Sequence, residues 1–150
     1  REAMLYKLNE LGIGGRTFNF TKNFLADRKI KTRIGEEYSE EFYLENGTPQ
    51  GSAISPLLFS IFIYDLPEPP PNVKVSIFAD DIAIWTSSKQ CNTIFRKAQQ
   101  YIRHLQHWAI KWGVKFSPLK TKYMVFHKGT LRNVNHLELY LNGNKLTRES

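Results

Sequence analysis

Apolar residues recur at the spacing of an amphipathic helix in three stretches of the chain. The longest covers residues 90–112, where apolar side chains recur three and four positions apart until Gly113. Shorter stretches at residues 2–11 and 17–26 show the same spacing, and Gly12 follows the first of them. Because glycine is favoured just beyond a helix C-terminus, both glycines are predicted to end their helices.

A fourth helix is predicted over residues 55–65 from its end signals. Ser55 is a favoured N-cap residue, and Pro56 would then take the first helical position, where proline is well tolerated. The proline-rich segment at residues 67–71 cannot continue a helix, so it is expected to form a rigid surface connection.

Residues 28–34 alternate basic side chains with apolar or neutral ones, a period that predicts a strand with one basic face. After a turn at residues 35–37, residues 41–45 are predicted to return as a second strand. The basic face fits contact with the backbone of a nucleic acid. It fits equally well an edge strand whose charges prevent aggregation.

A β-hairpin is predicted between residues 73 and 86. Residues 73–77 and 82–86 each alternate apolar with other side chains, as strands with one buried face do. The short segment between them places Ala79, Asp80 and Asp81 at the tip of the hairpin.

The C-terminal part of the chain is predicted to contain short strands. Residues 114–116 and 122–126 resemble strands on either side of a turn, and residues 137–146 predict a hairpin that turns at Asn142-Gly143. The helices and strands do not alternate strictly along the chain. This order indicates the α+β class, with helices packed on one face of an antiparallel sheet.

The composition is that of an ordinary globular protein, with 41% hydrophobic and 13% aromatic residues in a chain of 150. Cys91 is the only cysteine, which excludes an internal disulfide and a cysteine-based zinc cluster. No segment approaches the roughly 20 apolar residues of a membrane span, and the first residues lack the apolar region of a signal peptide. An intracellular, reducing compartment is therefore expected, with no membrane partner.

Charge is distributed unevenly around a net value of +7. Residues 1–34 and 86–150 are basic, whereas residues 35–47 contain five glutamates and no basic residue. Residues 48–85 are also acidic overall. An acidic centre between basic flanks suits a protein that holds cations in the middle and polyanions around them. A basic protein with solvated surface charges gives the same composition.

Asp80 and Asp81 form the first candidate site. Two adjacent carboxylates repel each other, and a divalent cation such as Mg²⁺, which prefers carboxylate oxygen, relieves that repulsion. A short tip between two β-branched strands would hold the carboxylates rigidly. The alternative is that the two residues serve only as turn formers, because aspartate is common in turns.

The segment Pro49-Gln50-Gly51 forms the second candidate site, ahead of the predicted helix at residues 55–65. Glycine allows a ligand to approach the backbone closely, and the glutamine amide offers both a donor and an acceptor. The N-terminus of the following helix favours phosphate. An ordinary junction between a loop and a helix has the same composition.

Taken together, these motifs resemble the palm of reverse transcriptases. Residues 49–59 are similar to motif B of that family, and the Phe-Ala-Asp-Asp at residues 78–81 is similar to motif C. The phenylalanine that begins this motif is similar to the one found in the branch of non-LTR retrotransposons and group II introns. Residues 112–122 resemble motif D, and residues 25–28 and 123–126 fit a jockey-type element, so the resemblance covers nearly the whole chain.

The resemblance implies nucleotidyl transfer with two Mg²⁺ ions, for which Mn²⁺ is an alternative. Asp80 would be a catalytic metal ligand and Asp81 a weaker or outer ligand. The substrates would be a deoxynucleoside triphosphate (dNTP), an RNA template and a DNA primer. The localisation implied for a retrotransposon protein is the nucleus and the cytoplasm.

The resemblance also implies a pocket for the incoming nucleotide. Pro49, Gln50 and Gly51 would line this pocket beside the template base. Lys120 would be the motif D lysine that protonates the leaving pyrophosphate, with Lys122 as the alternative. Either lysine fits a solvated surface charge as well.

One departure from the family concerns the third catalytic carboxylate, which belongs to motif A on a strand before the helix at residues 2–11. Neither Asp27 nor Asp65 stands in that context. The expectation is a partial palm without motif A at residues 1–126, followed by a palm-to-thumb connection at residues 127–150. The rest would lie in a longer polyprotein, and the chain alone is expected to be inactive.

Two other functions remain open from the sequence. A non-catalytic nucleic-acid-binding module, derived from a palm and kept for its basic surface, would have the same charge pattern. A group II intron maturase-like enzyme would share the chemistry and differ in its role in splicing.

Overall fold

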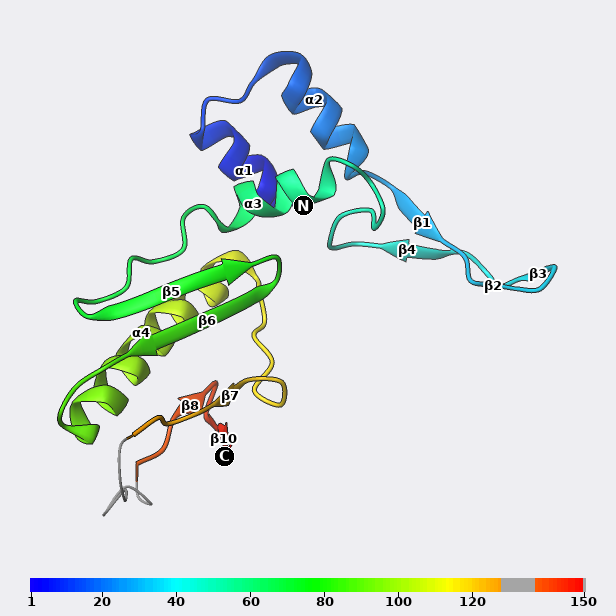
Figure 1. The fold of residues 1–150 in the computed structure, drawn as a ribbon. Helices are drawn as coiled ribbons and strands as arrows, with labels where there is room; N and C mark the ends of the chain where they lie inside the picture. The colour runs from blue at the N-terminus through cyan, green and yellow to red at the C-terminus, as the bar shows by residue number, and fades with distance from the viewer. Residues whose placement is uncertain (128–136, 150) are drawn as a thin grey trace. The chain divides into compact units, whose positions relative to one another are not determined.

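The computed structural model describes residues 1–127 and 137–149 of the chain. The chain divides into two units, Arg1–Asp65 and Leu66–Ser150 (Figure 1). Each unit has hydrophobic core residues of its own. The predicted domain boundary at residues 126–127 borders residues 128–136, which lie outside the described part, and it stays a prediction.

Three helices form the core of the first unit. They are α1 (Glu2–Glu10), α2 (Gly15–Phe24) and α3 (Ser55–Ile63). Both α2 and α3 contact α1. The buried residues of this core are Met4, Leu5, Leu8, Leu25 and Leu58. The helices predicted at residues 2–11, 17–26 and 55–65 are confirmed, and no end differs from the prediction by more than two residues.

The prediction that Ser55 caps α3 is wrong. Ser55 is the first residue of the helix, and Ile54 takes the N-cap position without a side-chain capping bond. The hydroxyl of Ser55 instead donates a hydrogen bond to the carbonyl oxygen of Pro49, at 2.6 Å. The serine therefore ties the preceding loop to the helix, because its side chain has a loop carbonyl within reach.

An arm of short antiparallel strands leaves the helices of the first unit (Figure 1). Its strands are β1 (Arg28–Ile30), β2 (Arg33–Ile34), β3 (Glu37–Tyr38) and β4 (Phe42–Leu44). Strand β1 pairs with β4, and β2 pairs with β3. The strands predicted at residues 28–34 and 41–45 are thus present in shorter pieces. The sequence pattern does not predict β3, because residue 37 belongs to the turn expected at residues 35–37.

The second unit is built on one hairpin and one long helix. Strands β5 (Val73–Phe78) and β6 (Asp81–Thr86) pair antiparallel, as the alternation predicted. Helix α4 (Cys91–Trp112) packs on the hairpin and ends at Gly113, which has the left-handed conformation expected beyond a helix. Val73 is buried in the same cluster as Tyr101 and Leu105 of α4.

The C-terminal strands also belong to the second unit. They are β7 (Lys122–Tyr123), β8 (Tyr140–Leu141), β9 (Asn144–Lys145) and β10 (Thr147–Arg148). The predicted turn at Asn142-Gly143 joins β8 to β9, and both of its residues have a positive φ, of 51° and 77°. Such a pair of positive angles is typical of tight hairpins.

The strand predicted at residues 114–116 is wrong, because the structure has no regular pairing there. The ring of Phe116 lies 6.5 Å from that of Trp108 on α4, in a stacked orientation. The apolar pattern of this segment thus reflects packing on the helix instead of a strand ladder. The strand predicted at residues 122–126 is reduced to the two residues of β7.

The α+β class is confirmed. In the described residues the strands form five two-stranded sheets. Four of these sheets are antiparallel, and the pairing of β7 with β10 is parallel. Within the described ranges, no helix has both the length and the apolar character that crossing a membrane requires.

Candidate active site

The tip of the β5–β6 hairpin carries the two aspartates. Phe78 pairs with Asp81, so Ala79 and Asp80 form a two-residue turn between them. Ala79 has a φ of 49°, which is uncommon for a residue with a Cβ atom. The tip is open to solvent, since Phe78 is 82% exposed and both aspartates are exposed.

The side chain of Asp81 belongs to the open face of the hairpin. Residues 82, 84 and 86 of β6 are half-buried, and Ile84 packs with the apolar cluster of α4. The alternate positions, which are those of Asp81, Ala83 and Trp85, are exposed. The period of two therefore places Asp81 on the face that α4 does not cover.

Neither Asp80 nor Asp81 has an ion-pair partner among residues 1–127 and 137–149. Two exposed, adjacent carboxylates without a cationic partner are suitable oxygen ligands for Mg²⁺. They cannot fill its octahedral shell alone. Within the described ranges, no third histidine, cysteine or acidic residue joins them to make a cluster. By themselves the two carboxylates could therefore supply only part of the ligand set of such a cation.

The Pro49-Gln50-Gly51 loop is a tight turn fastened to the start of α3. The amide of Ser52 donates to the carbonyl of Pro49 at 3.5 Å, and the hydroxyl of Ser55 donates to the same oxygen. Gly51 stands at the third position of this turn with a φ of 81°. A positive φ at that position strongly favours glycine. Gln50, at the second position, is exposed.

Arg28 binds the segment that leads into this loop. Its guanidinium donates to the carbonyl oxygens of Asn46 and Gly47, at 2.8 and 2.7 Å. Arg28 pairs with Leu44, the last residue of β4, so the strand register brings it beside the residues that follow. The sequence pattern placed Arg28 only on a basic face, because this contact depends on the pairing of two strands.

The two candidate lysines of motif D differ in their surroundings. Lys122 in β7 forms an ion pair with Glu149. Lys120 is exposed on a turn, and among the described residues it has no ion-pair partner. The turn is closed by Thr121, whose amide and hydroxyl both donate to the carbonyl of Ser117.

The candidate residues are divided between the two units. Pro49, Gln50 and Gly51 lie together on one loop of the first unit. Asp80 and Asp81 are adjacent on a hairpin of the second unit, where Lys120 occupies a separate turn.

Comparison with known proteins gives consistent matches. Residues 2–143 match the family model described as reverse transcriptase (RNA-dependent DNA polymerase). The chain is 36% identical over 124 residues to a probable RNA-directed DNA polymerase from transposon BS of Drosophila melanogaster, covering 78% of this chain and 14% of that protein. It is 32% identical over 131 residues to the RNA-directed DNA polymerase from mobile element jockey of Drosophila funebris, covering 83% and 14%.

The chain therefore spans 14% of the length of these two relatives. No solved structure matches it. The match to the family model includes the loop at residues 49–51 and the hairpin tip at residues 78–81. The chain belongs to the reverse transcriptase (RNA-dependent DNA polymerase) family, on the branch of the non-LTR retrotransposons.

Proposed function

We propose that this chain forms part of the palm of an RNA-directed DNA polymerase from a non-LTR retrotransposon. The enzyme would transfer a deoxynucleotide from a dNTP to the 3′-hydroxyl of a DNA primer, copying an RNA template. The observation that carries the proposal is the pair of exposed carboxylates at the hairpin tip, Asp80 and Asp81, with no cation beside them among the described residues. Such a pair suits a bound Mg²⁺, which proteins usually hold through one or two carboxylates.

The roles of the two aspartates are carried over from the resemblance to motif C. Asp80 lies in the turn itself, and we assign it as the metal ligand of the reaction. Asp81 begins β6 on the open face of the hairpin, and we assign it as a weaker or outer ligand. Bound Mg²⁺, or Mn²⁺ in its place, would activate the primer hydroxyl and stabilise the leaving pyrophosphate.

Pro49, Gln50 and Gly51 are proposed to line the pocket for the incoming nucleotide. The turn holds the backbone of this loop in one conformation, and Gln50 keeps its amide exposed for hydrogen bonding. Lys120 is proposed as the lysine that donates a proton to pyrophosphate. Its lack of an ion-pair partner within the described ranges supports it over Lys122, whose ammonium is paired with Glu149.

We also propose that residues 1–150 alone do not polymerise. The family chemistry needs a third carboxylate, and in the described part of the chain no third acidic group joins Asp80 and Asp81. Asp65 is the ion-pair partner of Lys7, and it does not stand in the sequence context of motif A. The working enzyme would be a longer polyprotein, acting in the nucleus and the cytoplasm, with residues 127–150 leading from the palm to the thumb.

Primer extension tests the proposal. The protein to assay is a longer one that includes the segment upstream of residue 1, with an RNA template, a DNA primer, dNTPs and Mg²⁺. Asp80→Asn should abolish incorporation while template binding stays near the wild-type level, because Lys and Arg contacts to phosphate set that affinity. Equal extension by Asp80→Asn and wild type would overturn the metal assignment. Incorporation by residues 1–150 alone would overturn the proposed inactivity.

A further inference from the structure

The arm formed by β1 to β4 contains none of the residues proposed to bind metal or nucleotide, yet it exposes several aromatic and basic side chains. Tyr38 is 62% exposed and Tyr43 is 67% exposed. Each ring has a cation beside it. The ammonium of Lys29 lies 4.9 Å from the ring centroid of Tyr43, and the guanidinium of Arg33 lies 5.5 Å from that of Tyr38. Large exposed aromatic groups beside basic ones suggest a binding surface.

The strand register is consistent with Tyr38 and Tyr43 lying on the same face of the arm, although they are five residues apart. Ile30 pairs with Phe42 and Arg33 pairs with Tyr38, so two residues join β1 to β2 and three residues join β3 to β4. The returning segment thus has one residue more than the outgoing one, as at a β-bulge. Without it, the odd spacing of Tyr38 and Tyr43 would put their rings on opposite faces.

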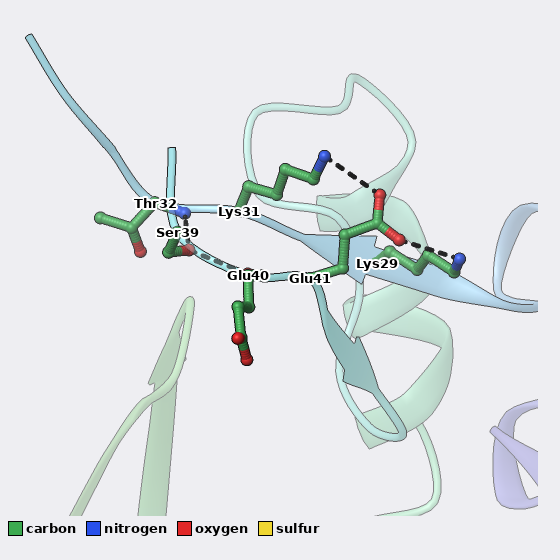
Figure 2. Close-up of polar contacts among 6 residues, drawn as sticks. All are labelled: Lys29, Lys31, Thr32, Ser39, Glu40 and Glu41. Carbon is green, nitrogen blue, oxygen red and sulfur yellow. Dashed lines mark hydrogen bonds and ion pairs between the residues drawn. The ribbon is translucent and has the colours of Figure 1, made fainter. Parts of the chain in front are cut away.

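A side chain completes the backbone hydrogen bonding at the bulge. The amide of Thr32 donates to the hydroxyl oxygen of Ser39 at 2.9 Å, and that hydroxyl donates to the carbonyl of Glu40 at 2.9 Å (Figure 2). The amide of Ser39 returns a bond to the carbonyl of Thr32, also at 2.9 Å. These hydrogen bonds stabilise the bulge, and the bulge determines which side chains lie on the same face of the arm.

Glu41 lies between the two tyrosines in the sequence, and its carboxylate contacts two lysines of the arm. Its carboxylate lies 2.9 Å from the ammonium of Lys29 and 3.2 Å from that of Lys31, one on each oxygen (Figure 2). These contacts lower the pKa of Glu41, chiefly through the hydrogen bond from Lys29. The two ammonium groups are thus arranged to hold one bidentate oxyanion, and a phosphate group of a polynucleotide has the same chemistry.

We propose that this face of the arm binds single-stranded nucleic acid, with Tyr38 and Tyr43 stacking on bases and Lys29, Lys31 and Arg33 contacting phosphates. Glu41 competes with phosphate for the two lysines, so its ion pairs with Lys29 and Lys31 must break when a phosphate binds there. The inference rests on the proposed function only for the kind of polymer, and it needs neither metal nor catalysis. It adds to the polymerase a surface for the unpaired strand.

Charge and stacking act together in this arrangement. Base–aromatic stacking tolerates any sequence, because every base has a π-face, whereas lysine contacts to phosphate supply affinity that falls with salt. The arm carries as many acidic groups as basic ones, so bulk charge alone would not attract a polyanion to it. Binding therefore depends on the release of Lys29 and Lys31 from Glu41 and on the two rings.

The test measures binding of the 150-residue chain to a fluorescent oligouridine by anisotropy, without divalent metal. Glu41→Gln should tighten binding about two- to fivefold, as expected for the loss of one exposed ion-pair competitor. Glu36→Gln is the matched control, since it makes the same charge change in the turn of this arm. Tyr38→Ala with Tyr43→Ala should weaken binding about tenfold or more, because stacking is lost.

Each outcome decides the matter. A larger effect of Glu41→Gln than of Glu36→Gln, together with loss of binding in the double tyrosine variant, supports the proposal. Equal effects of the two glutamine variants, or unchanged binding without the tyrosines, overturns it. Circular dichroism confirms that each variant is folded. The same series with oligothymidine compares single-stranded DNA with single-stranded RNA, and the series with duplex RNA compares paired with unpaired strands. Tighter binding to the duplex would also overturn the single-strand assignment. Failure here leaves primer extension unaffected, so the two proposals fail separately.

Discussion

The ammonium group of Lys7 forms an ion pair with the carboxylate of Asp65, which joins the first helix to the chain just beyond the end of α3. Lys7 is buried, with 1% of its side chain exposed, whereas 24% of the Asp65 side chain is exposed. Lys7 also donates to the carbonyl of Phe62 and lies 4.5 Å from the centroid of that ring. The carboxylate and the carbonyl oxygen beside it stabilise a lysine at this depth.

Removing the charge of Asp65 should therefore destabilise the first unit. Asp65→Asn leaves the ammonium of Lys7 buried without its counter-charge, and we expect a loss of about 2 kcal/mol, below the full cost of breaking a deeply buried pair because Asp65 is partly exposed. Lys7→Met with Asp65→Asn should recover most of that loss. Urea unfolding of the wild type and of these two variants measures the free energies of unfolding. A free energy of unfolding within about 0.5 kcal/mol of wild type for Asp65→Asn would refute the argument.

The elements that the sequence predicted best are those whose signal is local. The long stripe of α4 and the alternation of β5 and β6 each lie within one element, so neighbours along the chain determine them. The turn at Asn142-Gly143 is equally local, because those residue types suit positive φ angles.

The features that the sequence did not predict depend on residues far apart or on register. The contact of Lys7 with Asp65 joins residues 58 positions apart, and no periodicity encodes it. Arg28 reaches the loop after β4 only because β1 and β4 pair in one register. The predicted strand around Phe116 failed for a related reason, since its apolar side chains pack on a helix.

The candidate site was predicted in part by the same logic. Its motifs are short and continuous, so the hairpin tip with Asp80 and Asp81 and the turn at Gly51 could be placed from residue types alone. Their catalytic roles stay predictions. The partner that distinguishes Lys122 from Lys120 is Glu149, which a parallel strand pairing brings close, and the sequence pattern gave no sign of that pairing.

Gly51 should tolerate no side chain without cost. It has a φ of 81°, and a Cβ atom added there would meet nothing within 4 Å, so any penalty of Gly51→Ala comes from the backbone conformation alone. We expect a loss of about 1 kcal/mol or more in the free energy of unfolding. Gly51→Asn is the control, because asparagine adds a Cβ atom too but adopts positive φ angles more readily than alanine. Urea unfolding should show a clearly smaller loss for Gly51→Asn, and equal losses would contradict the backbone argument.

Ala79 presents the opposite case at the hairpin tip. Its φ of 49° is unfavourable for a residue with a Cβ atom, so Ala79→Gly should relieve strain and stabilise the hairpin by up to about 1 kcal/mol. Thermal unfolding followed by circular dichroism measures the change. Ala83→Gly on β6 is the matched control, since an extended strand position gains nothing from glycine and should lose stability. Destabilisation by Ala79→Gly of the same size as by Ala83→Gly would rule out strain at the tip.

Tyr101 should make the stability of the second unit depend on alkaline pH. Its ring is buried against Val73 and Leu105, its hydroxyl donates to the carbonyl of Pro67 at 2.9 Å, and burial raises the pKa of that hydroxyl above its usual value. Above about pH 10 the unfolded chain loses this proton first, so the folded state binds more protons. The contribution of Tyr101 is therefore complete below about pH 10 and is lost as pH rises toward the folded pKa.

Tyr101→Phe separates this contribution from the rest. At neutral pH the variant should lose about 1 kcal/mol of unfolding free energy, because the Pro67 carbonyl loses its donor. Above about pH 10 its stability should fall less steeply than that of wild type, since the titrating group is gone. Tyr64→Phe is the control, because it makes the same substitution at a ring that is 51% exposed, and it should change the pH profile less than Tyr101→Phe does. Parallel pH profiles for wild type and Tyr101→Phe would show that burial of this phenol does not set the alkaline limit.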